Sequence, residues 1–289
     1  MIREFDQALP HGITLACRGA GTGRTRVLLL HGFPEAAFVW DEVMLRLAPG
    51  LACVAPNLRG YAGSSAPADS AAYRAKPLVA DLVALIEALG APLDLVVAHD
   101  WGGALAWNLA AQRPDLMRRL LILNAPHPAA FLRELRGSAE QIAASAYMNF
   151  LVRPDAERLL AEDDWRRLWP FFGDAPWLDA ATRERYRAVW SRGMTGPLNY
   201  YRASPLRPAT ASDDAITRVE LPDAAVTVTV PTWVLWGERD HALRPGLLDG
   251  LERWVPKLQV ERVPQASHWI VHEAPARVVE AIEGALATP

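Results

Sequence analysis

The sequence is poor in cysteine: only Cys17 and Cys53 occur among its 289 residues. Two thiols cannot form the disulfide framework of a small secreted domain, so we expect a reducing, cytoplasmic environment. The sequence also lacks an apolar run long enough to cross a membrane, and residues 1–6 lack the apolar core of a signal peptide. These absences exclude the disulfide-rich and membrane-spanning classes, and we expect no membrane partner.

An excess of one charge is missing as well. The 30 Lys and Arg residues are nearly balanced by 33 Asp and Glu residues, and the basic side chains are scattered among acidic ones. Without a basic cluster, we expect no nucleic-acid partner. Because 51% of the residues are hydrophobic, the chain can bury a large core in one large domain, with or without an insertion.

Motifs for cofactors and metals are not found. Residues 19–24 (Gly-Ala-Gly-Thr-Gly-Arg) superficially resemble a phosphate-binding loop, but Arg24 occupies the third glycine position and the loop leads into a strand. We interpret the loop as a hairpin turn. His268 and His272 have the spacing of a metal-binding pair, but no third ligand accompanies them. We therefore expect no cofactor and no metal.

Apolar strand patterns alternate with helical patterns in the first part of the chain. Strands are predicted at residues 13–18, 27–31, 51–56, 94–98 and 119–124, and helices at residues 38–48, 77–89 and 101–112. Such alternation with short connections predicts an α/β fold, in which helices flank a mostly parallel sheet.

This alternation stops after Asn124. The following segment is helical in pattern and rich in Trp, Tyr and Arg. Strand patterns return only at residues 226–230, 232–237 and 258–263, with helices near 244–254 and at 275–286. We therefore expect a core domain, residues 1–125 and 225–289, with a helical cap (lid) domain, residues 126–224, inserted between two strands. Such a cap would cover the crevice in which open α/β sheets bind ligands.

A carboxylate stands between the strand at 94–98 and the helix that follows it. The residues two before and two after Asp100 are Ala98 and Gly102, which are both small. This spacing is typical of a nucleophile elbow, a strained turn that exposes one side chain at the end of a parallel sheet. Asp is also a common helix N-cap, but the small flanking residues favour the elbow. We predict that Asp100 is a nucleophile.

An acid and a histidine follow in the chain order that such a nucleophile requires. Asp240 comes just after a strand, and His268 follows the last strand. A carboxylate nucleophile forms an ester with a substrate carbon, a histidine activates water to cleave it, and a second acid orients the histidine. We assign these last two roles to His268 and Asp240, with Glu238 as the rival acid. The other histidines are expected to be structural or exposed.

Two backbone N–H groups are predicted to face the elbow. Residues 31–34 (His-Gly-Phe-Pro) follow an apolar strand, which would place them beside Asp100. We therefore predict that the N–H groups of Phe33 and Trp101 form an oxyanion hole, in which one donor contributes roughly 2.7–4 kcal/mol. The bond between Phe33 and Pro34 is a candidate cis peptide.

With these motifs, the chain resembles the epoxide hydrolases of the α/β-hydrolase fold over nearly its whole length. The similar segments are residues 31–34, 99–103 (His-Asp-Trp-Gly-Gly), 237–240 (Gly-Glu-Arg-Asp) and 267–269 (Ser-His-Trp). The resemblance implies hydrolysis of a small apolar epoxide to a vicinal diol through an ester on Asp100, with water as the second substrate. Asn57, Ala62 and Ala98 differ from the residues that are usual in relatives.

The resemblance also implies roles for two tyrosines of the cap. Tyr201 is the second Tyr of residues 198–202 (Leu-Asn-Tyr-Tyr-Arg), and Tyr147 lies seven residues before Pro154. Both match positions of ring-opening tyrosines in that family. A phenol suits the reaction because it can hydrogen-bond and protonate the alkoxide that epoxide opening releases. Tyr200 is expected to pack.

Other functions on this scaffold stay open. Haloalkane dehalogenases also use an Asp nucleophile and a Trp like Trp101, but many of them carry Asn in place of Phe33. A haloacetate dehalogenase that resembled this chain would carry Arg at position 101 and His at position 147, where this sequence has Trp101 and Tyr147. A ligand receptor without activity is disfavoured by the intact set of Asp100, Asp240 and His268. The sequence is compatible with a monomer or a homodimer.

Overall fold

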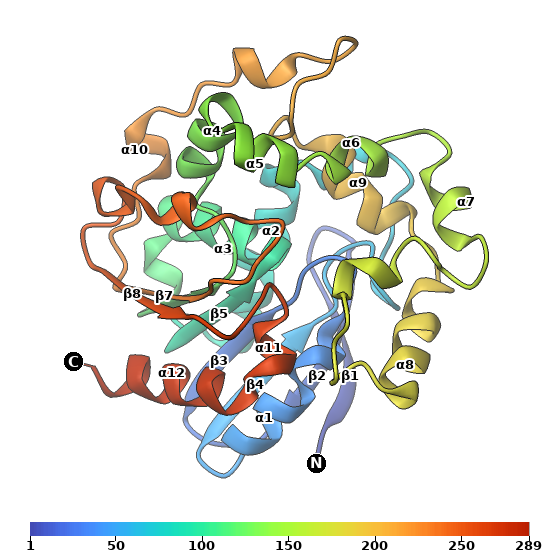
Figure 1. Ribbon diagram of the computed structural model, residues 1–289. Helices are drawn as coiled ribbons and strands as arrows, with labels where there is room; N and C mark the ends of the chain where they lie inside the picture. The colour runs from blue at the N-terminus through green and yellow to red at the C-terminus, as the bar shows by residue number, and fades with distance from the viewer. Residues whose placement is uncertain (289) are drawn as a thin grey trace.

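The apolar strands of the sequence lie side by side in one sheet (Figure 1). The computed structural model describes residues 1–288. Within them, eight strands form the sheet: β1 (Arg3–Ala8), β2 (Thr14–Ala20), β3 (Thr25–Leu30), β4 (Leu51–Pro56), β5 (Leu95–His99), β6 (Leu120–Leu123), β7 (Thr232–Gly237) and β8 (Leu258–Val263). Their order is β1-β2-β4-β3-β5-β6-β7-β8. Strands β3 to β8 are parallel, whereas β1 and β2 pair antiparallel. The predicted fold class is confirmed.

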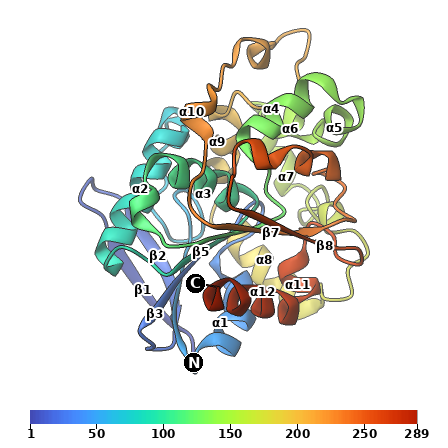
Figure 2. The same ribbon diagram turned by 90° about the vertical axis from the view of Figure 1, so that its left-hand side faces the viewer.

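The two faces of the sheet support separate cores. Successive residues of a strand point to opposite faces, so Val96 and Ala98 of β5 join one core, and Leu95 and Val97 join the other. The first core is covered by α2 (Ala75–Leu89) and α3 (Asp100–Gln112). The second is covered by α1 (Asp41–Leu47) and α12 (Pro275–Ala287), as Figure 2 shows. Burial on both faces explains why the central strands are apolar throughout.

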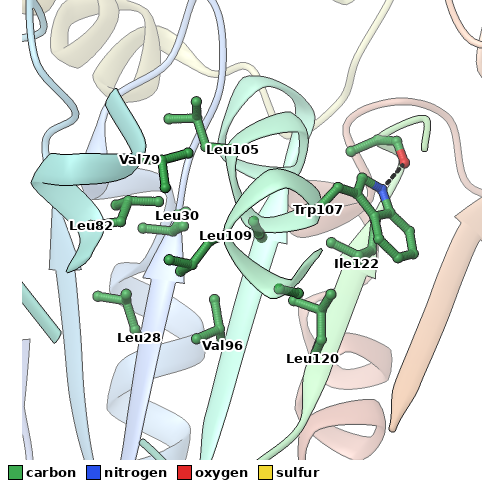
Figure 3. Close-up of a cluster of buried hydrophobic side chains, with 14 of the residues drawn as sticks. Leu28, Leu30, Val79, Leu82, Val96, Leu105, Trp107, Leu109, Leu120 and Ile122 are labelled. Atoms are coloured by element: carbon green, nitrogen blue, oxygen red, sulfur yellow. Dashed lines mark hydrogen bonds between the residues drawn. The ribbon is translucent and has the colours of Figure 1, made fainter. Parts of the chain in front are cut away.

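Helix α3 is anchored in the first core by large apolar side chains. Leu105 and Leu109 are buried, and Figure 3 shows them among side chains of α2 and of the sheet. The Trp107 indole N–H also donates a hydrogen bond to the carbonyl of Ala125, at 3.2 Å. Burying one Leu side chain contributes about 1.5–3 kcal/mol. Packing therefore fixes the position of the helix that begins at Asp100.

The chain between β6 and β7 is helical. Its described α-helices are α4 (Pro128–Gly137), α5 (Ala139–Ala144), α6 (Tyr147–Leu151), α7 (Ala156–Ala161), α8 (Ala180–Trp190), α9 (Thr195–Ala203) and α10 (Asp223–Val226). In Figure 1, α4, α5, α6 and α9 lie along the upper side of the molecule. Helices α6 and α9 reach the carboxyl end of β5, because their Tyr147 and Tyr201 line the same cavity as Asp100. None of the helices in residues 1–288 combines the length and apolarity needed to span a bilayer.

The N-terminal part of the sheet differs from the prediction. The sequence predicts a first strand at residues 13–18, but the edge strand β1 precedes it and pairs with β2. Strand β1 is largely exposed, so it has no continuous apolar run that would identify it. The interpretation of residues 19–24 as a hairpin turn is wrong. Strand β4 lies between β2 and β3, so this loop crosses the beginning of β4.

Two predicted elements in the C-terminal part are also wrong. Residues 226–230 do not form a strand: Val226 ends α10, and Val228 and Val230 are buried in the first core without joining the sheet. The helix predicted near 244–254 is replaced by two short 3-10 helices, η6 (Pro245–Leu248) and η7 (Leu251–Arg253). Gly250 separates them with a φ of 67°, which a continuing right-handed helix excludes.

Candidate active site

Asp100 occupies a strained position between β5 and α3. Its φ is 49°, a left-handed conformation that non-glycine residues rarely adopt. The turn is supported by a hydrogen bond of 3.0 Å from the Gly102 N–H to the His31 carbonyl. Gly32 is required there, because a Cβ at this position would lie 2.2 Å from Asp100 Oδ1. The local backbone therefore has the geometry of the predicted elbow.

The Asp100 carboxylate has two different environments. Oδ1 accepts a hydrogen bond of 2.7 Å from the Phe33 N–H, and Oδ2 lies 3.7 Å from His268 Nε2. The bond between Phe33 and Pro34 is cis, as the sequence analysis suggests. The N–H of Trp101 belongs to the first turn of α3, where N–H groups have no partner within a helix. Of the two predicted oxyanion donors, the Phe33 N–H thus contacts the carboxylate, and the Trp101 N–H follows Asp100 directly along the backbone.

Asp240 and His268 form a buried pair behind Asp100. Asp240 is fully buried, and its Oδ2 accepts a hydrogen bond of 2.7 Å from His268 Nδ1. Its Oδ1 accepts bonds of 2.8 Å from the N–H groups of Ala242 and Leu243. With Nδ1–H committed to Asp240, the Nε2 atom of His268 is the ring nitrogen that faces Asp100. The structure therefore brings the three predicted residues together.

The electrostatic interaction between Asp240 and His268 favours the ionised form of both side chains. Burial alone would lower the pKa of His268, but the negative charge of Asp240 and the hydrogen bond to it raise this pKa to about 9, with smaller contributions from Asp100 and Glu35. Burial would raise the pKa of Asp240, but the positive charge of His268 and several hydrogen bonds hold it below its usual range. The pairing of these two groups thus favours the protonated imidazole of His268 and the ionised carboxylate of Asp240.

Tyr147 and Tyr201 stand opposite Asp100 on α6 and α9. Their ring centroids are 6.2 Å apart, and the Tyr201 ring lies 5.0 Å from the Trp101 ring. Burial raises the pKa of both hydroxyls well above the usual value, and the negative charge of Asp100 raises both further. The two phenols therefore stay protonated and can donate hydrogen bonds. Tyr200 instead donates its hydroxyl proton to the carbonyl of Arg59, at 2.9 Å.

A cavity of about 240 Å³ begins at these residues. Asp100, Trp101, Tyr147 and Tyr201 line one end of it. Most of the remaining lining is apolar and comes from α2, α3, α4 and the segment after α9. A site of this kind, an apolar cavity with a few convergent polar groups, suits a small apolar molecule.

Glu35 is a buried carboxylate that the sequence analysis does not single out. It accepts hydrogen bonds from His99 Nδ1 at 3.1 Å, from His272 Nε2 at 3.0 Å and from the Tyr186 hydroxyl at 2.9 Å. Burial alone would raise its pKa, but the bonds to His272 and His99 hold the pKa well below the usual range. His99 Nε2 in turn donates to the carbonyl of His268, at 2.8 Å. The feature of the sequence that could have indicated Glu35 is its position directly after the His-Gly-Phe-Pro motif.

Asn124 is a second residue whose role is not visible in the sequence. Its Nδ2 donates to Asp240 Oδ2 at 2.8 Å, and its Oδ1 accepts from the Gly237 N–H at 2.8 Å. It therefore links the end of β6 to the loop that carries Asp240. The rival acid, Glu238, pairs with Arg262 at 3.2 Å on the surface. Asn57, one of the departures from relatives, donates from Nδ2 to the Ala62 carbonyl, at 2.6 Å, a bond that an Asp could not make.

Among residues 1–288, no three or more His, Cys, Asp or Glu side chains are grouped so that they could hold a metal ion. His268 and His272 are directed to different carboxylates, Asp240 and Glu35. The arrangement combines a carboxylate at a strand end, a charge-paired histidine and two phenol donors, a set of groups suited to opening a strained carbon–oxygen ring and hydrolysing an ester.

Comparison with known proteins agrees with this geometry. A family model described as the alpha/beta hydrolase fold matches residues 25–275. The chain is 33% identical to the AB hydrolase superfamily protein YfhM of Bacillus subtilis, over 94% of each chain. It is 31% identical to an epoxide hydrolase of Caballeronia sordidicola, over 96% of this chain and 92% of the relative. The crystal structure of Bacillus megaterium epoxide hydrolase in complex with an inhibitor superposes with a TM-score of 0.89, at 28% identity, over 98% of this chain and 100% of the other. By sequence and by structure, the chain belongs to the epoxide hydrolases of the α/β-hydrolase fold family.

Proposed function

We propose that the protein hydrolyses small apolar epoxides to vicinal diols through an ester on Asp100. The observation that carries this proposal is the environment of the Asp100 carboxylate. One oxygen is bound by the Phe33 N–H at 2.7 Å, and the other faces His268, while two tyrosines line the same cavity. A nucleophile and two proton donors thus line a single apolar space, with a stabilising donor and a base directly beside the nucleophile.

In the first step, Asp100 Oδ2 attacks one carbon of the epoxide ring. The new bond joins Oδ2 to that carbon, and the bond between the same carbon and the ring oxygen breaks, with its electron pair moving to the oxygen. Tyr147 and Tyr201 hydrogen-bond this oxygen, and one of them supplies its proton. Because burial keeps both hydroxyls protonated, they are suited to donate at this moment.

In the second step, a water molecule cleaves the ester. His268 Nε2 takes a proton from the water, and the hydroxide oxygen adds to Cγ of Asp100. Negative charge then develops on Oδ1, which the N–H of Phe33 already contacts and to which the Trp101 N–H can also donate. When the tetrahedral intermediate collapses, the bond from Cγ to Oδ2 breaks, the protonated His268 gives its proton to the departing Oδ2, and the diol leaves. The proton that the Asp100 carboxyl group then carries returns to the tyrosine that supplied a proton in the first step, which restores the starting state. Asp240 holds the Nδ1–H of His268 throughout.

Helices between β6 and β7 are part of this proposal. We assign residues 126–224 as a cap over a core of residues 1–125 and 225–289. Support comes from Tyr147 and Tyr201, which α6 and α9 direct to the same cavity as Asp100 of the core. A cap in this place excludes bulk water, and it lets the ring oxygen be contacted from the side opposite the nucleophile.

The pKa of His268 is expected to change during the cycle. Esterification removes the negative charge of Asp100, which is one of the charges that raise this pKa to about 9 in the resting protein. The imidazole should therefore release its proton more readily just when a base is needed. In an NMR titration, His268 of the free protein should titrate near 9, and ester hydrolysis in single turnovers should rise with pH through a lower apparent pKa. An apparent pKa for hydrolysis at or above the free value would contradict this.

The proposed function is tested by a direct comparison of products. The purified protein is incubated in parallel with an aryl epoxide, a haloalkane and fluoroacetate. We expect diol from the epoxide and no enzyme-dependent halide from the other two. Halide release without diol formation would replace this proposal by a dehalogenase function. The Asp100→Asn variant serves as the control for background hydrolysis of each substrate.

A further inference from the structure

The cavity beside Asp100 extends along α3. Besides Asp100 and Trp101, α3 contributes Ala104, Leu105 and Asn108 to its lining. These positions share one face of the helix, and at a rise of about 1.5 Å per residue the eight steps from Asp100 to Asn108 span roughly 12 Å. The cavity thus follows the axis of α3 away from the nucleophile.

The far part of this cavity is closed by the segment that follows α9. Leu206, Val219 and Leu221 contribute to the lining there, and like Phe131 of α4 they pack against a small buried cluster of Leu132, Leu135 and Ile216. The guanidinium of Arg136, also on α4, holds the carbonyls of residues 216, 217 and 219 at 2.6, 3.0 and 2.6 Å. These contacts give the cavity a defined apolar end.

An aromatic wall, which we define as Phe33, Phe171 and Trp269, stands beside the site and outside the lining of the cavity. The Phe33 and Phe171 rings are 6.2 Å apart, and the Trp269 indole N–H donates to the carbonyl of Phe171 at 2.9 Å. The wall adjoins the site directly, since Phe33 binds Asp100 and the Phe171 ring lies 5.5 Å from that of Tyr147. None of these three wall residues lines the cavity.

Room for a substrate is therefore unequal on the two sides of the nucleophile. The cavity, at about 240 Å³, is smaller than the roughly 300–1,000 Å³ that is common for ligand pockets, so it accommodates one substituent of moderate size. On the wall side, Phe33 and Trp269 are buried, and ring pairs at these distances are in contact. A substituent directed there would have to displace packed aromatic side chains.

We infer that this enzyme is selective for terminal epoxides that carry a single extended apolar substituent, against trans-1,2-disubstituted epoxides. The inference rests on the proposed function. With the ring held between Asp100 and the two tyrosines, the substituent of a terminal epoxide lies along α3, and the other ring carbon carries only hydrogen. A trans-disubstituted epoxide directs its two substituents to opposite sides of the ring, so one of them meets the aromatic wall.

Two isomers provide the test. The compounds 1,2-epoxyoctane and trans-4,5-epoxyoctane have the same formula and similar apolar area, and they differ in where the ring lies. We expect kcat/KM for the terminal isomer to be higher by at least about 30-fold, within the range that a pocket achieves by steric fit. Equal values, or a preference for the internal isomer, would overturn the inference and leave the proposed function intact. Diol formation from neither isomer would overturn the proposed function, and the inference with it.

Two variants and one control variant test the cause of the selectivity. Phe171→Ala opens the wall and should reduce the ratio of the two kcat/KM values about fivefold. Phe5→Ala removes an aromatic ring from β1 far from the site, and it should leave the ratio unchanged. Leu105→Phe narrows the cavity along α3, and it should lower kcat/KM for 1,2-epoxyoctane more than for 1,2-epoxypropane. If Phe171→Ala left the ratio unaltered while the folded state was retained, or if Leu105→Phe slowed both terminal epoxides equally, the inference would be wrong.

Discussion

The His268→Gln variant is expected to stop after a single reaction, with one equivalent of substrate covalently attached to Asp100. Glutamine cannot take a proton from water, but Asp100 keeps the Phe33 hydrogen bond on Oδ1 and the free oxygen Oδ2 that performs the attack. Loss of a general base lowers a rate by about 10²–10⁴-fold, so the ester should accumulate. Intact-protein mass spectrometry should show an increase equal to one epoxide, and peptide mapping should place it on Asp100.

The Asp100→Asn variant is the matched control for this experiment. The neutral amide is similar in size, but it is a poor nucleophile, so neither mass increase nor diol should be observed. Adding this change to His268→Gln should abolish the adduct. A His268→Gln protein that turns over at the wild-type rate, or that is alkylated at another residue, would be incompatible with the two-step scheme.

Removing both cap phenols is expected to have the second largest effect. In the Tyr147→Phe, Tyr201→Phe double variant, the ring oxygen would leave as an alkoxide without a hydrogen-bond donor. Loss of one preorganised donor typically reduces kcat by roughly 10²–10³-fold, and the double change should reach at least the upper value. Pre-steady-state measurement of ester formation should show that the loss occurs in ring opening.

Tyr200→Phe provides the comparison within the same helix. Its hydroxyl donates to the carbonyl of Arg59, so the variant should lose some stability but retain the rate of ester formation. Each single variant, Tyr147→Phe or Tyr201→Phe, should fall between the wild type and the double variant, because the remaining phenol still contacts the oxygen. Full activity of the double variant would remove the tyrosines from the mechanism.

The central sheet is predictable from the sequence because its strands are buried on both faces. Strand β5 is completely buried, so its residues are all apolar up to His99, and the pattern identifies it without ambiguity. The edge strand β1 has mostly exposed residues and therefore carries no such pattern. The order of β2, β4 and β3 in the sheet also cannot be predicted from the local sequence, because strand pairing depends on contacts between segments distant in the sequence.

The candidate site is predictable where function requires a particular residue type next to a strand end. Asp100, Asp240 and His268 satisfy this condition, and the fold brings them together. Glu35 and Asn124 act through contacts with distant segments, at 3.1 Å to His99 and 2.8 Å to Asp240, and no local spacing reveals such partners. The extent of the cavity depends on packing of side chains from several helices, so it follows only from the structure.

The buried carboxylate of Glu35 has a consequence for how such enzymes can be recombined. Its Oε1 atom is satisfied by His272 and by the hydroxyl of Tyr186, which belongs to α8 in the helical segment between β6 and β7. A buried charge that loses a hydrogen-bond partner is strongly destabilising. The helical segment and the sheet are therefore not interchangeable parts. A chimera that grafts this segment from a relative would have to preserve a hydroxyl at position 186, or replace Glu35 along with it.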